Sequence, residues 1–150
     1  LAFESASPRV LRKYATNKWD PERMPIDALI RVCKDQGLVI GGNYMLGYPD
    51  ETREEMKKTI DLARCHKLAG IDWVNFFSVM PLPGTPLFDE AIRTGNFPQN
   101  FNPDYMDWTK ANFVNTIVPA EEVAEMRQKA WEEINGREFQ ENKIAMTTYS

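Results

Sequence analysis

Hydrophobic residues follow two patterns along this chain, short continuous runs and repeats at helical spacing. Continuous apolar runs cover residues 38–46 and 71–79, and a shorter one opens the chain at residues 1–4. Apolar residues at both parities are typical of strands in a buried parallel sheet. We therefore predict three buried strands.

Between these runs, apolar residues return every three or four positions, which predicts helices. The expected helix starts combine a capping residue with proline or with a capping-box glutamate, and glycines mark the ends. The predicted starts are Ser7-Pro8, Asp20-Pro21, Thr52 with Glu55, Thr85-Pro86 and Pro119-Ala120, and the predicted ends are Gly37, Gly70 and Gly95. The last helix is expected to reach about residue 140, with Gly136 as a possible interruption.

Strands and helices alternate over residues 1–95, with a repeat of roughly thirty-five residues, the size of a βα unit. Right-handed crossovers then give a parallel sheet of at least three strands. Three strands are few for a closed barrel, so the pattern fits half of a larger α/β structure. The chain begins inside a strand and without Met, which suggests a fragment of a longer protein.

Two of the strand-to-helix turns are unusual in composition. Residues 47–52 read Gly-Tyr-Pro-Asp-Glu-Thr, and residues 80–86 read Met-Pro-Leu-Pro-Gly-Thr-Pro. Ligands of parallel α/β proteins bind at the carboxyl ends of strands, where these turns lie. The proline-rich turn suits either a backbone platform for a flat ligand such as a purine or a stiff connector.

Individual polar residues in these turns allow more than one interpretation. Asp50 and Thr52 are expected to cap the helix, whereas Glu51 can cap the helix, brace the loop or meet a ligand. Glu4 and Ser5 end the first strand, where they suit ribose hydroxyls or an amino group. For Glu4 we favour the ligand role, because that position is expected to be partly buried.

Composition restricts the class of protein. Hydrophobic residues make up 43% and aromatic residues 11% of the 150 residues, which fits one folded domain. The net charge is −4 without a basic run, which argues against nucleic acid as a partner. No apolar run approaches the ~20 residues of a membrane span. We predict a cytoplasmic location.

Cysteine and histidine are scarce. Cys33 and Cys65 fall on separate predicted helices, and we expect two buried free thiols. The single histidine, His66, lies near a helix end, and we expect it to be partly exposed. These residues cannot form a Cys/His metal site by themselves.

Three segments resemble, in order, motifs of the radical S-adenosylmethionine superfamily. Residues 3–7, Phe-Glu-Ser-Ala-Ser, resemble its G-x-E-S-G-S segment. Residues 43–52 are similar to the fifth-strand motif G-x-I-x-G-x-P-G-E-T, and residues 81–86 are similar to the P-x-P-G-T-P after the sixth strand. Residues 107–135 resemble the C-terminal extension of members that carry a cobalamin-binding domain.

The resemblance implies a fold and a cofactor site. The fold is an α/β half-barrel, strands four to six of a partial TIM-type barrel at residues 1–95, with a helical C-terminal extension at 96–150. Glu4 and Ser5 would bind the ribose or amino group of S-adenosylmethionine, Met45 would pack on the adenine, and Gly47 and Glu51 would shape the loop. The adenine edge would be lined by Val79, Met80 and Pro81. Asn43, which stands where the family commonly has glycine, is included in this cofactor-binding set.

The resemblance also implies chemistry whose metal ligands are missing here. The C-x3-C-x2-C motif that holds a [4Fe-4S] cluster is absent, and Cys33 and Cys65 cannot replace it. By this resemblance the parent protein would generate a 5′-deoxyadenosyl radical, and members of the cobalamin subgroup would use it to methylate a small-molecule or lipid-like substrate. This chain alone would be inactive, and the missing N-terminal half of the barrel would be its partner.

Three alternatives stay open from the sequence. The half-barrel can bind a nucleoside-type ligand without catalysis, or it can assemble with a second chain. The three motifs can also be turn chemistry in an ordinary α/β domain. An uncovered barrel interior and exposed edge strands predict self-association.

Overall fold

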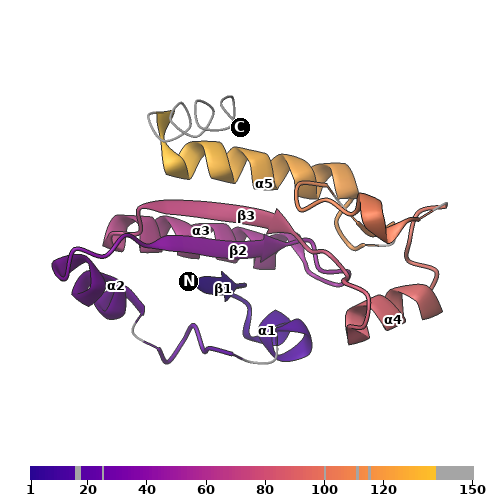
Figure 1. Cartoon of the computed structure of the whole chain (residues 1–150), viewed down its shortest axis with the longest axis horizontal. Helices are drawn as coiled ribbons and strands as arrows, with labels where there is room; N and C mark the ends of the chain where they lie inside the picture. The colour runs from indigo at the N-terminus through magenta and orange to yellow at the C-terminus, as the bar shows by residue number, and fades with distance from the viewer. Residues whose placement is uncertain (16–17, 25, 100, 111, 115, 138–150) are drawn as a thin grey trace.

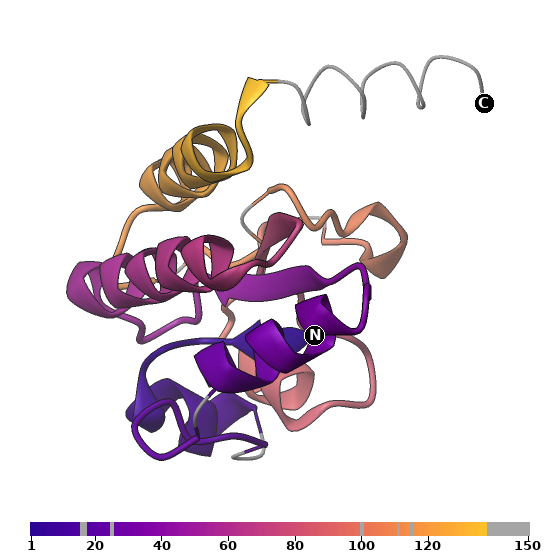
Figure 2. The ribbon, with the colours of Figure 1, turned by 90° about the vertical axis from the view of Figure 1, so that its left-hand side faces the viewer.

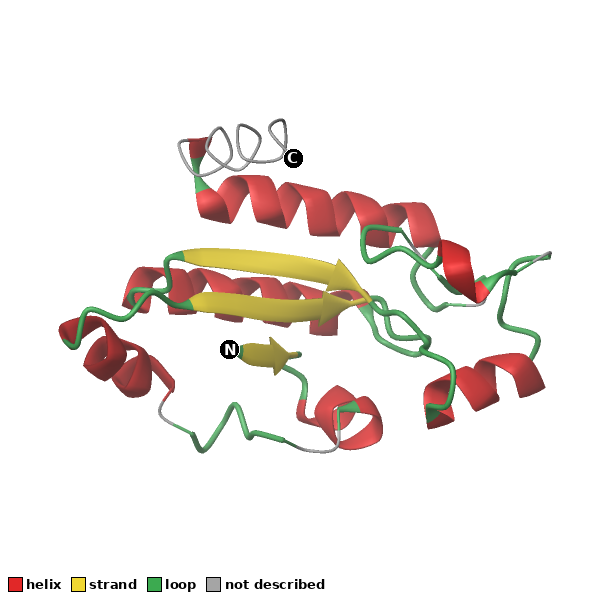
Figure 3. Ribbon diagram, viewed as in Figure 1, coloured by secondary structure: helices red, strands yellow, loops and turns green. Residues whose placement is uncertain are grey.

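The computed structural model describes residues 1–15, 18–24, 26–99, 101–110, 112–114 and 116–137. The three predicted strands are confirmed as β1 (Ala2–Glu4), β2 (Gly41–Leu46) and β3 (Trp73–Ser78), each shorter than its apolar run. They form one parallel sheet in the order β1-β2-β3 (Figures 1 and 3). Their carboxyl ends therefore meet at one edge of the sheet.

Five α-helices accompany this sheet in the described part of the chain. They are α1 (Pro8–Tyr14), α2 (Ile26–Asp35), α3 (Arg53–Ala69), α4 (Pro86–Arg93) and α5 (Ala120–Asn135), with a short 3-10 helix at Pro103–Tyr105. The chain thus has an α/β fold with a three-stranded parallel sheet. Closure as a half-barrel and the boundary at residue 95 stay predictions.

Local capping explains where most helices begin. The hydroxyls of Ser7, Thr52 and Thr85 each accept a backbone N–H of the first turn, and Thr52 forms a complete capping box with Glu55. One predicted start was wrong. Asp20-Pro21 opens only a turn, because Asp20 accepts the N–H groups of Glu22 and Met24, and α2 begins at Ile26.

The end of the last helix also differs from the prediction. α5 stops at Asn135, and Gly136 follows with a φ of 73°. Glycine adopts this left-handed backbone without the steric cost that a Cβ imposes. The predicted continuation through residues 138–140 lies outside the described residues.

Helices cover one face of the sheet. α3 packs on β2 and β3, α5 packs on β3, and the two helices contact each other (Figure 2). Side chains therefore alternate along the strands: Tyr44, Leu46, Val74 and Phe76 are buried, whereas Asn43, Met45, Asn75 and Phe77 on the other face are half-buried. The prediction of fully buried strands is correct for the helix-covered face only.

The outer edge of β3 is capped by side chains and a loop. The Asn135 amide accepts the N–H of Val74 at 2.8 Å and donates to its carbonyl at 2.9 Å. Arg127 donates to the Phe76 carbonyl, and Ser78 N–H donates to the Trp108 carbonyl. These bonds take the place of a neighbouring strand along β3. Self-association stays a prediction.

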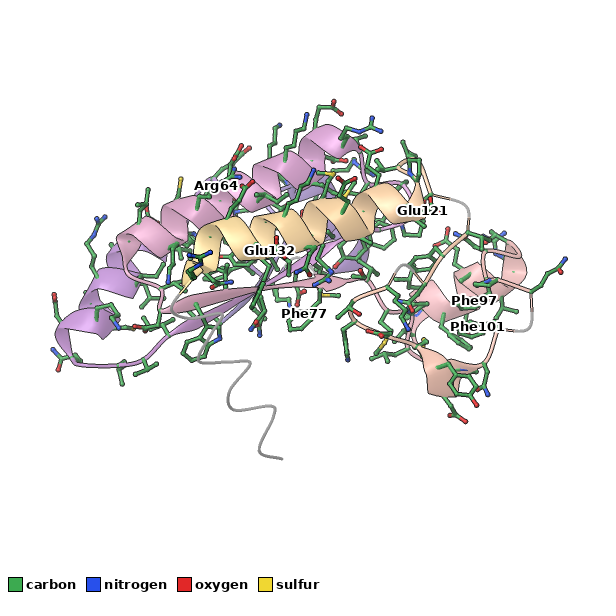
Figure 4. All side chains as sticks on the ribbon, turned by 90° about the horizontal axis from the view of Figure 1, so that it is seen from above. Arg64, Phe77, Phe97, Phe101, Glu121 and Glu132 are labelled. Atoms are coloured by element: carbon green, nitrogen blue, oxygen red, sulfur yellow. The ribbon has the colours of Figure 1, made fainter. Side chains whose placement is uncertain are left out.

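A second, smaller core lies at the carboxyl edge of the sheet. It consists of Val10, Tyr48, Val79, Ala91 and Phe113, with Tyr14, Met45, Leu87 and Phe97 packed against it. Phe97 in turn stacks on Phe101, with ring centroids 3.8 Å apart (Figure 4). This core fixes α1 and α4 beside the ends of the strands, where the candidate site forms.

None of the described helices is long and apolar enough to cross a membrane. The cytoplasmic location stays a prediction.

Candidate functional site

A cavity of about 390 Å³ opens at the carboxyl edge of the sheet. All three strands contribute to it, through Glu4 at the end of β1, Met45 and Tyr48 at the end of β2, and Val79 and Met80 after β3. Its remaining lining residues are Tyr14, Ala15, Lys18, Leu82, Thr85, Leu87 and Trp108. Its volume is in the range of small-molecule sites, ~300–1,000 Å³. We call it the edge cavity.

Glu4 holds the least usual backbone conformation in the described chain. Its φ is +63°, and it is the one residue other than glycine with a positive φ among the described residues. Non-glycine residues rarely adopt this conformation, and such strain is concentrated at functional sites. The half-buried carboxylate lines the edge cavity and pairs with the ammonium of Lys18. The expected partial burial of Glu4 is confirmed, and its ligand role stays a prediction.

The strain at Glu4 predicts an inverted order of stability for two variants. Glu4→Gly and Glu4→Ala both remove the carboxylate, but only glycine accepts a φ of +63° freely. We expect Glu4→Gly to be more stable than Glu4→Ala by about 1 kcal/mol, the reverse of the usual order in a strand. Urea denaturation of both variants measures the difference. Equal stabilities, or a more stable alanine variant, would show that Glu4 is unstrained.

Aromatic rings form one wall of the edge cavity. Tyr14 from α1 stacks on Tyr48 from the loop after β2, with ring centroids 4.7 Å apart and planes at 16°. Burial raises the pKa of Tyr48 and raises that of Tyr14 to about 12, so both phenols are neutral near pH 7. Trp108 contributes a further ring to the lining.

The proline-rich turn and the residues before it also line the cavity. Val79 and Met80 line the cavity, and Pro81 is buried directly after them. The Asn112 amide donates to the Val79 carbonyl at 3.0 Å, and Val79 N–H donates to the Leu46 carbonyl. The backbone of Val79 is therefore held from both sides.

Glu51 braces the loop that carries Tyr48. Its Oε2 accepts the N–H groups of Gly47 and Tyr48, at 2.8 and 3.2 Å, and the residue is 1% exposed. Its Oε1 is buried and has no hydrogen-bond partner among the described residues. Burial raises the pKa of Glu51 to about 7, against the two amide hydrogen bonds, which favour the ionised form. Of the three roles left open by the sequence, the structure shows the loop brace.

Asp50 ties the same loop to α1 rather than capping α3. Its carboxylate accepts hydrogen bonds from Arg9, Lys13 and the Tyr14 hydroxyl, at 2.7 to 3.0 Å. The hydrogen bonds from Lys13 and Tyr14 and the nearby positive charges hold its pKa below the usual value despite partial burial. Arg9 also binds Glu55 of the capping box. This network positions Tyr14 against Tyr48.

Not every residue of the predicted cofactor set reaches the edge cavity. Glu4, Met45, Val79 and Met80 line it, whereas the other members lie around it. Ser5 is fully buried and hydrogen-bonded to Thr59 of α3, and Asn43 bonds Asn75 on the half-buried face. Gly47 packs under Val123 of α5, with φ +88°.

Tyr14, Lys18 and Tyr48 were missed as lining residues. Tyr14 and Lys18 lie outside the motif segments at residues 3–7, 43–52 and 81–86, and only the folded chain brings them to the strand ends. Tyr48 carried a sequence signal, since it lies inside the turn at residues 47–52. Trp108 also lines the cavity, although it was not in the predicted cofactor-binding set.

Two expectations about scarce residues were wrong. His66 is not a surface residue but 2% exposed, because Phe3, Trp19 and Tyr44 surround its ring and the Tyr44 hydroxyl bonds its Nδ1 at 2.8 Å. The two thiols are free but not both buried, since Cys33 is half-buried and Cys65 is exposed.

Two named proteins are similar to this chain. An uncharacterized methyltransferase of Pyrococcus horikoshii is 32% identical over 136 residues, which cover 87% of this chain and 27% of that protein. The cytidylyl-2-hydroxyethylphosphonate methyltransferase of Streptomyces wedmorensis is 29% identical over 145 residues, 91% of this chain and 26% of that protein. The chain spans about a quarter of the length of these curated relatives. No protein-family model matches the sequence.

These comparisons correct the assignment to the radical S-adenosylmethionine superfamily. Both relatives are named as methyltransferases, neither name points to that superfamily, and no family model supports it. The iron–sulfur cluster and cobalamin that came with the assignment are unsupported as well. Within the described residues there is no group of three or more His, Cys, Asp or Glu that could hold a metal ion.

Proposed function

We propose that this chain is part of a methyltransferase and that the edge cavity binds S-adenosylmethionine. The names of the two relatives support the reaction class. The observation that carries the proposal is the cavity itself, where the strained Glu4 carboxylate and a wall of stacked tyrosines meet at the carboxyl edge of a parallel sheet. Ligands of α/β proteins bind at this edge.

The lining residues match the parts of S-adenosylmethionine. The Glu4 carboxylate accepts hydrogen bonds, which suits the ribose hydroxyls or the amino group of the methionyl part. Lys18, now paired with Glu4, is a cation for the methionyl carboxylate. Met45, Val79 and Met80 present apolar surface suited to a flat adenine.

S-adenosylmethionine supplies a methyl group bonded to a positively charged sulfur. The ring of Tyr48 is suited to a cation, because aromatic rings carry negative potential above and below their planes. The ring of Tyr14 already has the Lys13 ammonium 4.8 Å from its centroid. The Glu51 brace and the Asp50 network hold these rings in place without touching the cavity. The chain's own part in the reaction is therefore to bind and orient the methyl donor.

Titration calorimetry with S-adenosylmethionine and S-adenosylhomocysteine tests the proposal on wild type, Glu4→Gln and Glu22→Gln. Glutamine keeps the size of Glu4 but loses the charge, and a hydrogen bond to a charged group contributes about 1.5–3 kcal/mol. We expect Glu4→Gln to bind both compounds at least about tenfold more weakly. Glu22, exposed and outside the cavity, is the matched control and should leave affinity unchanged. Equal affinity in all three proteins, or no binding to folded wild type, would overturn the proposal.

A further inference from the structure

A second cavity lies beside α2 and α3, away from the strand ends. Its volume is about 310 Å³, and it shares no lining residue with the edge cavity. Trp19, Met24 and Leu62 give it apolar walls, and Asp27, Arg31 and His66 give it polar groups. We call it the His66 cavity. Nothing in the proposed methyl-donor site uses these residues.

The imidazole of His66 contributes to the lining of this cavity. The ring is 2% exposed, and its Nδ1 is 2.8 Å from the Tyr44 hydroxyl. Burial lowers the pKa of His66 and raises that of Tyr44, so both groups are neutral near pH 7. In the tautomer where Nδ1 carries no proton, Nδ1 accepts the proton of the Tyr44 hydroxyl. The imidazole proton then lies on Nε2.

The Asp27 carboxylate lies near Nε2 of His66 but is not hydrogen-bonded to it. Nε2 is 4.0 Å from the Asp27 carboxylate, which is too far for a hydrogen bond. A buried donor and a half-exposed carboxylate therefore line the same space, each able to bind a further group. A ligand that accepts a hydrogen bond from Nε2 and donates one to the Asp27 carboxylate would gain both bonds, and the bond to the charged carboxylate contributes more than a neutral one.

The walls suit a flat ligand. The indole N–H of Trp19 donates to the Phe3 carbonyl, so the rest of the ring supplies apolar surface. Met24 and Leu62 add flexible apolar side chains, and sulfur next to a ring is favourable. Arg31, exposed and one helical turn after Asp27, adds a positive charge to the lining.

We propose that the His66 cavity is a binding site for a flat heterocycle that carries a hydrogen-bond donor beside an acceptor on one edge, as a nucleoside base does. The acceptor of the base takes the Nε2–H of His66, and its donor binds the Asp27 carboxylate. Trp19 and Met24 contact the faces of the ring. This site is independent of methyl-donor binding in the edge cavity.

Uridine and 3-methyluridine form a matched pair of probes. Both offer carbonyl acceptors, but 3-methyluridine lacks the ring N–H that Asp27 would accept. His66 is the sole histidine of the chain, so its imidazole nitrogens give one set of signals in a long-range proton–nitrogen correlation spectrum. We expect uridine to shift the Nε2 signal saturably and 3-methyluridine to bind at least about tenfold more weakly.

Variants of exposed residues assign the site without disturbing the buried histidine. Asp27→Asn should weaken uridine binding about tenfold or more, whereas Asp35→Asn, exposed on the same helix, should have no effect. The proposal is overturned if uridine leaves the His66 signals unchanged or if both nucleosides bind equally. It is also overturned if Glu4→Gln abolishes uridine binding while Asp27→Asn does not, since the nucleoside would then occupy the edge cavity.

Discussion

Replacing Gly47 by alanine is expected to lower the free energy of unfolding by about 3 kcal/mol. Two effects add at this position. The φ of Gly47 is +88°, and a Cβ placed there would lie 2.8 Å from Cγ1 of Val123. The left-handed backbone costs an L-residue about 1–2 kcal/mol, and overpacking costs about 1–3 kcal/mol. Because the loop also carries Tyr48, the variant should lose affinity in the edge cavity.

The chain offers a control that separates the two effects. Gly84 has a φ of +83°, but a Cβ there would have nothing within 4 Å. Gly84→Ala should therefore show only the backbone effect, about 1–2 kcal/mol. Urea denaturation of both variants gives the comparison. If Gly47→Ala is no less stable than Gly84→Ala, the contact with α5 does not matter.

A double-mutant cycle isolates the contact itself. Val123→Ala removes the methyl groups that the new Cβ of Gly47→Ala would meet. The double variant should then be more stable than the sum of the single effects predicts. Simple additivity would place the strain elsewhere in the loop.

Replacing Glu51 by glutamine is expected to change how stability depends on pH. Glutamine keeps an oxygen for the N–H groups of Gly47 and Tyr48 but cannot ionise. Burial raises the pKa of Glu51 to about 7 in the folded protein, from 4.5. Between these values the folded state binds more protons than the unfolded state, so the stability from Glu51 is lost as the pH rises toward 7 and above.

The size of this effect follows from the difference between the two pKa values. It corresponds to about 3 kcal/mol over the interval from about pH 4 to about pH 8. We therefore expect the stability of Glu51→Gln relative to wild type to rise by about that amount across the interval. The measurement is urea denaturation of both proteins at several pH values.

Other groups also titrate in this pH interval. Their contributions to stability cancel when Glu51→Gln is compared with wild type. Burial lowers the pKa of His66, so its stabilising contribution is present above pH 6.5 and is lost as the pH falls, opposite in sign to Glu51. His66 is the same in both proteins and cancels. Asp72, whose pKa the hydrogen bond from Lys34 lowers, gives the control. Asp72→Asn should not alter the slope above pH 5, and a constant difference between Glu51→Gln and wild type would contradict the prediction.

The sequence could predict features that depend on residues close together along the chain. Ser7, Thr52 and Thr85 bond an N–H three residues away, and Gly37 and Gly70 adopt positive φ at helix ends. Because these interactions span only one turn, the pattern predicted most helix starts. Asp20-Pro21 shows the limit, since the same local signal serves a turn as well as a helix.

For the candidate site, the sequence located the strand ends. It did not show which side chains from distant parts of the chain these residues contact. Glu4, Met45, Val79 and Met80 follow or end predicted strands, and parallel strands bring those ends to one edge. Ser5 has the same position along the chain as a strand end, yet its hydroxyl turns to Thr59, fifty-four residues away. No local pattern records such a pair.

The sequence by itself therefore determined the order of the elements, most helix caps, the parallel strands and the strand ends that line the edge cavity. Tertiary structure alone decided the left-handed backbone of Glu4, the burial of His66 and Glu51, and the Asn135 cap on β3. The physical reason is the separation along the chain over which each interaction acts. Hydrophobic period and capping act within about four residues. Burial and the pKa shifts that it causes depend on side chains that only the folded chain brings together.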